Sequence, residues 1–320
     1  MYTIGVDLGG TNIAVGVCDE NLNIIEKGSV PTGADRDGEL IVKDMAELAK
    51  KLLDKKGISL DEIEYVGIAS PGSTNVDTGV VEYANNLPFV NFPIADIFKK
   101  FLPVKKVLIA NDANAAALAE ALAGAAKGTK TSVMITLGTG VGGGVIINGK
   151  IFAGGINYSG TELGHTVIVK DGRQCSCGRR GCWETYSSAT GLTLTTKEKM
   201  AELKYKNFPS LLFEEAEKEG KVSARTAFNA MKRGDKFGAE IVKEYIEYLA
   251  AGITDMINIF QPEVLSIGGG VCNEKEYLTK PLIELVDHEQ YTRGNAVKTK
   301  IVVAQLGNDA GIIGAAGLGK

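Results

Sequence analysis

The stretch Asp7-Leu-Gly-Gly-Thr-Asn12 decides how this chain is expected to fold. It ends one apolar segment that begins at residue 2, and it precedes another at residues 13–17. We interpret the three as a strand, a glycine turn and a returning strand. The same order recurs around Leu137-Gly-Thr-Gly140, which strand-like segments at residues 132–136 and 144–147 flank. Each unit continues through a turn into a third strand, so the sequence predicts one domain plan present twice.

Hydrophobic periodicity and turn-forming residues predict the remaining elements. The expected helices cover residues 38–56, 112–126, 188–205, 210–219, 223–233, 235–260 and 274–288. Further strands are expected at residues 24–30, 65–69, 107–110, 264–267 and 301–305. Asn148-Gly149 predicts a hairpin turn, and Asn308-Asp309 predicts the start of a short closing helix. The passage that contains Asn85-Asn86-Leu-Pro88 is polar and rich in turns, and no regular element is expected there.

Length and composition describe a globular protein of about two domains. Of the 320 residues, 44% are apolar and 23% are charged. The formal net charge of −4 gives no basic surface for nucleic acid or for an anionic membrane. No apolar run approaches the ~20 residues of a membrane span, and no signal peptide is visible at the start. With only five cysteines, we expect a protein of the reducing cytoplasm, without nucleic-acid or membrane partners.

Candidate metal ligands cluster in Glu162-Leu-Gly-His165 and in Cys175-Ser-Cys-Gly-Arg-Arg-Gly-Cys-Trp-Glu184. Three of the five cysteines and one of the two histidines fall in this region. Thiolates and a neutral imidazole are the ligands that tetrahedral zinc prefers, and the two glycines permit tight turns around an ion. Four protein ligands are typical of a structural zinc site rather than a catalytic one. The predicted ligands are His165, Cys175, Cys177 and Cys182.

The second glycine turn formally matches Gly-x-Gly-x-x-Gly, the fingerprint of dinucleotide-binding folds. That fingerprint should open a helix, whereas residues 144–152 are expected to form a strand and a hairpin, so we reject this interpretation. A glycine turn between two strands still presents backbone N–H groups to an anion. Two such turns, one in each repeat, are therefore candidates to hold one polyphosphate.

Together, the motifs of the chain resemble those of the ROK family of sugar kinases and repressors, in order and over essentially the whole length. They are Asp7-Leu-Gly-Gly-Thr-Asn12, Asn111-Asp112, Leu137-Gly-Thr-Gly140, Glu162-Leu-Gly-His165 and the cysteine motif that ends at Glu184. Among family members the chain looks most similar to the bacterial ATP-dependent glucokinases. The resemblance implies an α/β, actin-like ATPase fold of the ribonuclease H type, with two domains and a zinc-binding loop. Family repressors carry an additional helix-turn-helix domain at the N-terminus, and we expect none here.

The resemblance implies that the chain transfers a phosphoryl group from ATP to the 6-hydroxyl of glucose. Asp112 would be the catalytic base that accepts the hydroxyl proton, although a helix N-cap would occupy the same place in the sequence. Asp7 would help to hold Mg²⁺, through water. The expected nucleotide-binding residues are Asp7, Gly9, Gly10, Thr11, Asn12, Gly138, Thr139, Gly140, Gly268, Gly269 and Gly270.

A sugar presents many hydroxyls, so its pocket needs carboxylates, amides and imidazole. By resemblance, the sugar-binding residues are Gly72, Asn85, Asn86, Asn111, Asp112, Glu162, His165 and Glu184. One ring nitrogen of His165 would bind zinc while the other donates to the sugar. We therefore expect loss of zinc to weaken sugar binding more than nucleotide binding. His288, by contrast, is expected to be exposed and without function.

Two lobes are expected, residues 1–110 plus 307–320 and residues 111–306, and the family resemblance implies a homodimer. Three functions remain open at this point. The favoured one is a glucose kinase, the second is a kinase for another hexose such as N-acetylmannosamine or fructose, and the third is a sugar-sensing regulator without turnover. Asp112 and the two phosphate turns favour an enzyme.

Overall fold

The computed structural model describes residues 1–156 and 158–320, which form two compact units. Unit 1 consists of Met1–Met134, Gly144–Thr161 and Ala304–Lys320, and unit 2 consists of Ile135–Gly143 and Glu162–Val303. These units differ from the two lobes expected from the sequence. Unit 1 also contains the helix that follows residue 111, which was expected in the second lobe. Lobes are defined by their movement, so the expected lobe boundaries stay a prediction.

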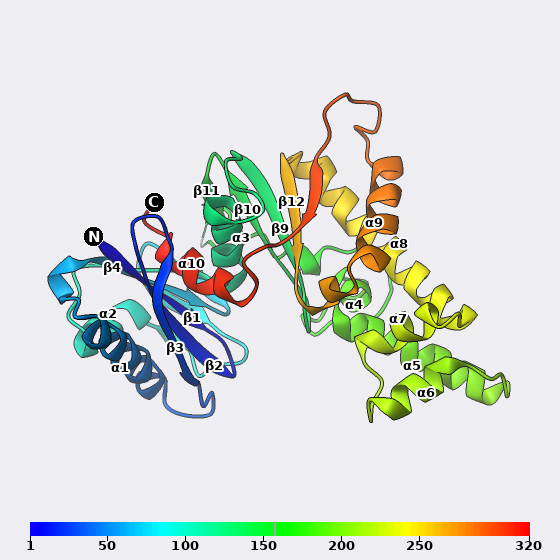
Figure 1. The fold of residues 1–320 in the computed structure, drawn as a ribbon, viewed down its shortest axis with the longest axis horizontal. Coiled ribbons are helices and arrows are strands. Elements are labelled where there is room, and N and C mark those ends of the chain that lie inside the picture. Colours follow the sequence, from blue (N-terminus) through cyan, green and yellow to red (C-terminus); the bar gives the residue numbers. More distant parts are fainter. Residues whose placement is uncertain (157) are drawn as a thin grey trace. The chain divides into compact units, whose positions relative to one another are not determined.

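A five-stranded sheet forms the centre of unit 1, in the order β3-β2-β1-β4-β8 (Figure 1). The strands are β1 (Tyr2–Leu8), β2 (Asn12–Cys18), β3 (Ile24–Pro31), β4 (Ile63–Ser70) and β8 (Val107–Asn111). Strands β1, β2 and β3 form an antiparallel meander, whereas β4 pairs in parallel with both β1 and β8. The carboxyl ends of β1, β4 and β8 therefore lie at one edge of the sheet, which brings Asp7, Ser70 and Asn111 to that edge.

Helix α1 (Gly38–Lys56) has the bounds that the sequence predicts. It begins after Asp37, whose side chain accepts a hydrogen bond from Glu39 N, and it ends at Gly57 in the left-handed conformation (φ 66°). Its apolar face packs on the sheet together with α2 (Ile94–Phe101), and the two helices share one core with the even-numbered side chains of β1.

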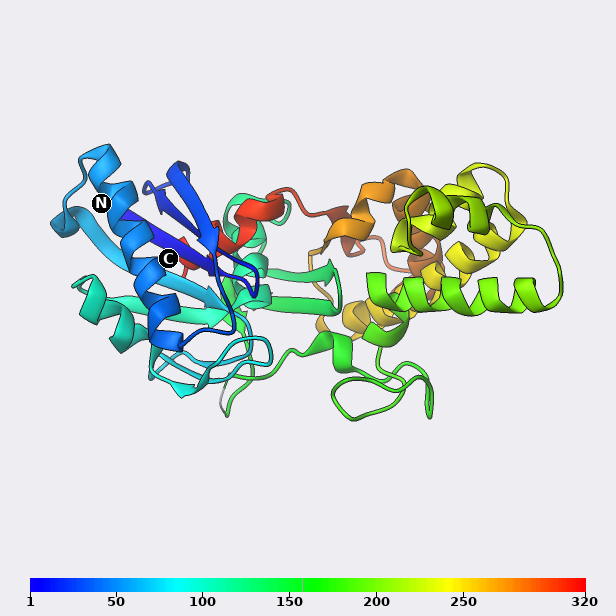
Figure 2. The ribbon, with the colours of Figure 1, turned by 90° about the horizontal axis from the view of Figure 1, so that it is seen from below.

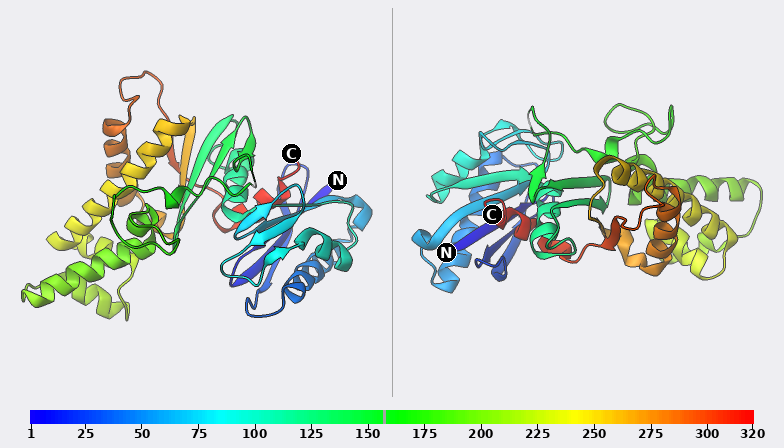
Figure 3. Two further views of the ribbon diagram at one scale, coloured as in Figure 1. Left: turned by 180° about the vertical axis from the view of Figure 1, so that it is seen from behind. Right: turned by 90° about the horizontal axis from the view of Figure 1, so that it is seen from above.

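The opposite face of the unit 1 sheet meets α10 (Ala310–Ala316). Two strand glycines allow this contact, because a Cβ on Gly5 would lie 1.9 Å from Ile312 O and a Cβ on Gly67 would lie 1.8 Å from Ala315 O. The backbone of α10 therefore lies directly on β1 and β4, beside α3 (Asp112–Ala123) (Figure 3). This close approach fixes α10 against β1, next to the strand end that carries Asp7.

Helix α3 ends three residues before the predicted position. The buried carboxylate of Glu120 accepts a hydrogen bond from Ala125 N (2.7 Å), and the Glu120 carbonyl accepts from Gly124 N and Ala126 N. The other carboxylate oxygen of Glu120 accepts from Gln305 N and Leu306 N, at 2.9 Å each. One side chain thus terminates α3 and anchors the segment that leads into α10.

The prediction of no regular element after β4 is wrong. The chain there forms a small antiparallel sheet of β5 (Ser73–Asn75), β6 (Val80–Tyr83) and β7 (Val90–Phe92), followed by α2. Strands of three or four residues are too short to show an alternating pattern, which explains why the sequence did not reveal them.

A second five-stranded sheet has the order β11-β10-β9-β12-β13. Its strands are β9 (Thr131–Leu137), β10 (Val141–Ile147), β11 (Lys150–Phe152), β12 (Val264–Gly268) and β13 (Lys300–Val303). Taken in chain order, these strands occupy the same positions as the five strands of the first sheet. Asn148 and Gly149 both have positive φ (54° and 74°) in the β10–β11 turn, as a tight hairpin of this kind requires. The predicted duplication is therefore confirmed.

Unit 2 is largely helical (Figures 1 and 2). Its α-helices are α4 (Glu184–Ser187), α5 (Ala189–Tyr205), α6 (Leu211–Lys218), α7 (Ala224–Lys232), α8 (Lys236–Phe260) and α9 (Glu276–Glu289). Ser188, Ser210, Ser223 and Asp235 each cap the helix that follows with a side-chain oxygen. Helix α9 starts two residues later than predicted, because Lys275 has φ 53° and separates it from a short 3₁₀ turn.

The cysteine loop of unit 2 is fastened to α8 by Trp183. This fully buried ring lies against Gly252, where a Cβ would come within 2.1 Å of the indole, and its Nε1 donates to Tyr248 O (3.1 Å). Trp183 therefore holds the segment between Cys182 and Glu184 rigidly on α8, the longest helix described in the unit.

Across the described residues 1–156 and 158–320, none of the helices is both long and apolar enough to span a membrane.

Candidate active site

The glycine turn of unit 1 follows directly from β1. Gly9 N donates to Asn12 O (2.9 Å) and closes the turn, and Gly10, Thr11 and Asn12 are exposed. The buried hydroxyl of Thr32 donates to Gly9 O (2.6 Å) and holds the turn from behind. The turn therefore presents exposed backbone on a fixed base, as a phosphate-binding loop requires.

Asp7 lies in β1, immediately before this turn, with its carboxylate against α10. A Cβ on Gly311 would lie 2.3 Å from Asp7 Cγ, so only glycine leaves room for the carboxylate at that position. Burial, and secondarily the charge of Asp112, raise the pKa of Asp7 to about 6. Two carboxylates thus lie close together at one edge of the sheet.

Asn111 and Asp112 stand where β8 passes into α3. The side chain of Asn111 is the N-cap, since its Oδ1 accepts from Ala113 N (3.0 Å) and Asn114 N (3.2 Å). Its Nδ2 donates to Gly72 O (3.1 Å), which links the helix start to the turn after β4. The capping role therefore belongs to Asn111, whereas Asp112 is the first helical residue.

Burial raises the pKa of the Asp112 carboxyl above its ordinary value. One oxygen, Oδ1, lies 2.8 Å from Ala113 N. A carboxylate with a raised pKa is the kind of group that serves as a general base. In the duplicated fold this residue also lies at the carboxyl edge of the parallel strands, where α/β proteins bind their ligands.

Three further candidate sugar residues of unit 1 follow β4, and one of them lies beside the glycine turn. Gly72 has φ 92°, and a Cβ there would lie 2.1 Å from Tyr83 O, so the turn is restricted to glycine. Asn85 and Asn86 are exposed and are joined by a weak bond of 3.4 Å between their amides. The Cβ position of Gly10 lies 3.8 Å from Asn86 Cβ, which places this asparagine beside the glycine turn.

In unit 2 the structure brings the four predicted metal ligands together. One ligand atom from each of His165, Cys175, Cys177 and Cys182 lies within 4.8 Å of every other. Cys175 Sγ lies 3.5 Å from His165 Nδ1, and Cys177 Sγ lies 3.7 Å from Cys182 Sγ. Tetrahedral zinc with ordinary bond lengths gives edges of about 3.5 Å between sulfur and nitrogen and about 3.8 Å between sulfurs. The donor set therefore fits zinc in both chemistry and spacing.

The loop around this cluster depends on its glycines. Gly178 and Gly181 have φ 89° and 79°, and a Cβ on Gly181 would lie 1.6 Å from Val169 O. The backbone N–H of Arg179 lowers the pKa of the Cys177 thiol, which favours the thiolate that a metal binds. All five cysteines of the chain are free of disulfides.

The glycine turn of unit 2 stands at the same place between two strands as that of unit 1, but its closing hydrogen bond spans one residue fewer. Gly138 N donates to Gly140 O (3.0 Å), and Gly138 and Thr139 are exposed. Its support comes from a different source, because Glu184 Oε2 accepts from Val141 N (3.1 Å) directly after the turn. A Cβ on Gly140 would lie 2.1 Å from the same oxygen.

Further contacts hold the unit 2 turn from several directions. Ala189 N donates to Gly138 O (2.9 Å), and the Cβ position of Gly164 lies 2.1 Å from Val141 O. Gly269 follows β12 with φ 95°, and its Cβ position lies 2.3 Å from Leu137 O. Gly269, directly after β12, therefore lies against the base of this turn.

Glu162 and His165 enclose a short 3₁₀ turn, Leu163–His165, in which His165 N donates to Glu162 O (3.0 Å). Glu162 is exposed, and His165 is half-buried with Nδ1 toward the cluster. The other ring nitrogen, Nε2, therefore points away from the metal cluster and is left to bind a different ligand.

The residues expected from the sequence to bind ligands are found in both units. Unit 1 holds Asp7, the turn at residues 9–12, Gly72, Asn85, Asn86, Asn111 and Asp112; unit 2 holds the turn at residues 138–140, Glu162, His165, Glu184, the cysteines and residues 268–270. Sequence reasoning missed Thr32 and Gly311, which act only through contacts distant in the chain. It also missed the bond from Val141 to Glu184.

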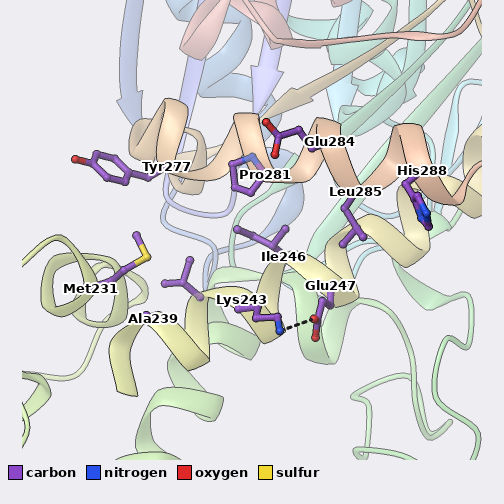
Figure 4. A pocket seen from close by; sticks show the side chains of 11 residues that line it. Met231, Ala239, Lys243, Ile246, Glu247, Tyr277, Pro281, Glu284, Leu285 and His288 are labelled. Atoms are coloured by element: carbon purple, nitrogen blue, oxygen red, sulfur yellow. Dashed lines mark ion pairs between the residues drawn. The ribbon is translucent and has the colours of Figure 1, made fainter. Parts of the chain in front are cut away.

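A groove of about 510 Å³ lies elsewhere in unit 2, between α8 and α9 (Figure 4). Apolar side chains such as Ile246 and Leu285 form its floor, and Lys243, Glu247 and His288 stand along it. None of the residues expected from the sequence to bind sugar, nucleotide or metal lines this groove. His288 is exposed, as expected.

Comparison with known proteins agrees with this arrangement. The sequence pattern of the ROK family matches residues 3–320. A glucokinase of Thermotoga maritima is 38% identical over 318 residues, which cover 98% of this chain and 96% of that protein. A glucokinase of Halalkalibacterium halodurans is 36% identical over 314 residues, which cover 98% of this chain and 93% of that protein.

Among solved structures, a ROK family glucokinase from Streptomyces griseus, in complex with glucose and AMPPNP, is 32% identical to this chain. The similarity covers 99% of both chains with a TM-score of 0.78. Family pattern, full-length relatives and fold agree, and the chain belongs to the ROK family.

Proposed function

We infer that this chain is an ATP-dependent hexose kinase that phosphorylates glucose at the 6-hydroxyl. The observation that carries this inference is the half-buried Asp112 carboxylate, whose pKa is raised and which lies near Asp7, in a chain that is 36–38% identical to two glucokinases over nearly its full length. A regulator that only senses sugar has no need of a carboxylate with a raised pKa at the carboxyl edge of the parallel strands.

In this proposal Asp112 accepts the proton of the sugar 6-hydroxyl as that oxygen attacks the terminal phosphorus of ATP. A raised pKa suits this role, because a more basic carboxylate draws the proton more strongly. Asn111 caps α3 and so fixes where the carboxylate stands. The ADP oxygen leaves on the opposite side of the phosphorus, so the atoms of the transfer balance without any other reactant.

The two glycine turns would bind the phosphates through backbone N–H groups, with Gly268, Gly269 and Gly270 against the nucleoside. Asp7 would hold Mg²⁺, because a half-buried carboxylate whose pKa burial and Asp112 raise to about 6 gains from a nearby cation. That ion supplies positive charge to the phosphate oxygens when it is bound.

We propose that the cluster of His165 and the three cysteines binds one structural zinc ion, on the basis of the spacing described above. His165, Glu162 and Glu184 would then present one imidazole and two carboxylates to the sugar hydroxyls. Gly72, Asn85, Asn86 and Asn111 would contribute backbone and amide groups from unit 1.

An ADP-release assay over a panel of sugars tests the proposal. The panel should contain glucose, mannose, fructose, N-acetylglucosamine and N-acetylmannosamine, each with Mg²⁺ and ATP. We expect glucose to give the highest kcat/KM. A higher kcat/KM for an N-acetylated sugar would identify the chain as a kinase for that sugar. No ADP release with any sugar would favour a sugar-sensing regulator.

We further propose that the chain forms a homodimer and acts in the cytoplasm, as the resemblance and the composition led us to expect. Size-exclusion chromatography with light scattering measures the first point directly. A mass of one chain at micromolar concentration would contradict it.

A further inference from the structure

We propose that Glu184 is a positioning residue which ties the metal cluster to the glycine turn at residues 138–140, so that metal loading sets the affinity for nucleotide. This rests on the proposed function, and it changes one expectation drawn from the sequence. There, the metal was expected to act on sugar binding more than on nucleotide binding.

The first step is the position of the Glu184 carboxylate. Oε2 accepts from Val141 N at 3.1 Å, and Oε1 lies 3.8 Å from Cys175 Sγ. One side chain therefore touches a metal ligand with one oxygen and the end of the phosphate turn with the other. Glu184 is also only two residues from Cys182, and the buried Trp183 between them prevents independent movement.

The second step is that the turn at residues 138–140 contacts the chain both before and after the metal-binding residues. Gly164, next to His165, meets Val141 O so closely that a Cβ would lie 2.1 Å from it. Ala189, five residues beyond Glu184, donates its N–H to Gly138 O at 2.9 Å. The backbone on each side of the cluster thus contacts either Gly138 or Val141.

The third step is that Gly140 is shaped around this carboxylate. The three atoms nearest to a Cβ built on Gly140 are Oε2, Cδ and Cγ of Glu184, at 2.1, 3.1 and 3.8 Å. An alanine at 140 would therefore push the carboxylate off Val141 N while leaving the rest of the turn with room. This gives a second variant that breaks the link without altering Glu184 itself.

Physically, a phosphate turn binds well when its N–H groups are already aimed at the anion. Metal bound to His165 and the cysteines fixes the segment that carries Glu184, and Glu184 fixes Val141. Without metal the loop loses its cross-link, so the turn must be ordered when nucleotide binds, and that cost lowers affinity. Coupling between two sites of this kind is commonly about 5- to 150-fold.

The experiment measures binding of Mg²⁺–AMPPNP by calorimetry, without sugar, on zinc-loaded protein and on protein treated with a chelator. For the parent we expect chelation to weaken nucleotide binding about tenfold. Glu184→Ala should bind nucleotide as weakly when loaded as the stripped parent does, and chelation should change it little further. Glu184→Gln should keep most of the parent's affinity, because its amide oxygen still accepts from Val141 N.

Two controls separate this link from general damage. Glu198→Gln alters an exposed carboxylate that pairs with Arg173 on the same loop (2.7 Å) but lies away from the turn, and it should keep the parent's metal dependence. In a double-mutant cycle, Gly140→Ala should weaken nucleotide binding in the parent and have little effect in Glu184→Ala, since the clash is then gone.

Hydrogen exchange of the peptide that contains Val141 provides a measurement independent of ligand. Exchange should be slow in the loaded parent and faster after chelation and in Glu184→Ala. The proposal is overturned if chelation leaves both Val141 exchange and nucleotide affinity of the parent unchanged, or if Glu184→Ala keeps the parent's metal dependence. If the parent binds no nucleotide at all, the proposed function fails, and the exchange of Val141 alone then decides whether the link exists.

Discussion

The two glycine turns of this molecule share one local plan and differ in what supports them. In unit 1 the turn at residues 9–12 is held by Thr32, which directly follows β3, and Asp7 lies just before the turn in β1. In unit 2 the turn at residues 138–140 has Thr136 at the place of Asp7, and its carboxylate comes from Glu184, which begins α4 directly after the metal loop. Duplication thus supplied the scaffold twice, and later segments supplied different chemistry to each copy.

The largest effect is expected from Asp112→Asn, which removes the base that the account places in unit 1. The amide keeps the size of the side chain but cannot accept the proton, so kcat should fall about 10³-fold, within the range usual for general bases. Glucose affinity should change by less than about tenfold. Steady-state kinetics together with glucose titration measure both, and a turnover close to the parent's would remove Asp112 from the mechanism.

Gly311→Ala tests whether α10 positions Asp7. The new Cβ would lie 2.3 Å from the Asp7 carboxyl carbon, so the carboxylate must move and kcat should fall about tenfold, with a higher Mg²⁺ requirement. Gly317→Ala lies at the end of the same helix and away from Asp7, since the atoms nearest to its Cβ would be Leu122 Cδ1 at 2.6 Å and Ile313 O at 3.2 Å. This control should keep the parent's Mg²⁺ dependence; equal losses in both variants would indicate damage to α10 alone.

Cys177→Ala addresses the metal loop of unit 2. One of four ligands is lost, so zinc content should fall from about one ion per chain and the melting temperature should drop by roughly 5–10 °C. Hydrogen exchange should quicken around residue 141 and stay unchanged around residues 9–12. Cys272→Ala, a cysteine outside the cluster, serves as the control. Unchanged zinc content in Cys177→Ala would contradict the ligand assignment.

Thr32→Val should produce the smallest effect. It removes the hydrogen bond to Gly9 O at a buried position, which costs about 1 kcal/mol of folding stability and should raise the KM for ATP about threefold. Thr196→Val removes a buried hydroxyl that bonds within α5 (2.8 Å to Leu192 O). It should cost similar stability without changing KM, so a KM effect common to both variants would argue against an anchoring role for Thr32.

Much of the fold could be predicted, because its signals are local. The duplicated strand–turn–strand order is visible in two short motifs, and α1 has an aspartate cap and a C-terminal glycine that define its bounds. The small sheet of β5, β6 and β7 could not be predicted, because its strands are too short to alternate. The end of α3 depends on Glu120, whose partners at residues 305 and 306 lie far along the chain.

The candidate site shows the same limit. Four candidate metal ligands within eighteen residues could be recognised as a group from the sequence, and the structure brings them together. The bond between Glu184 and Val141 spans 43 positions and leaves no pattern in the sequence, nor does the restriction that Asp7 places on Gly311. Contacts of this kind follow from packing between elements, which local periodicity does not encode.

The most direct test of the account compares glucose with 6-deoxyglucose, which lacks the acceptor hydroxyl, in an ADP-release assay with Mg²⁺ and ATP. The account predicts ADP release with glucose, at a rate that saturates with sugar, together with glucose 6-phosphate as the product by phosphorus NMR. With 6-deoxyglucose it predicts no ADP above the background without sugar. Equal ADP release with both sugars, or no release with either, would contradict the proposed kinase activity.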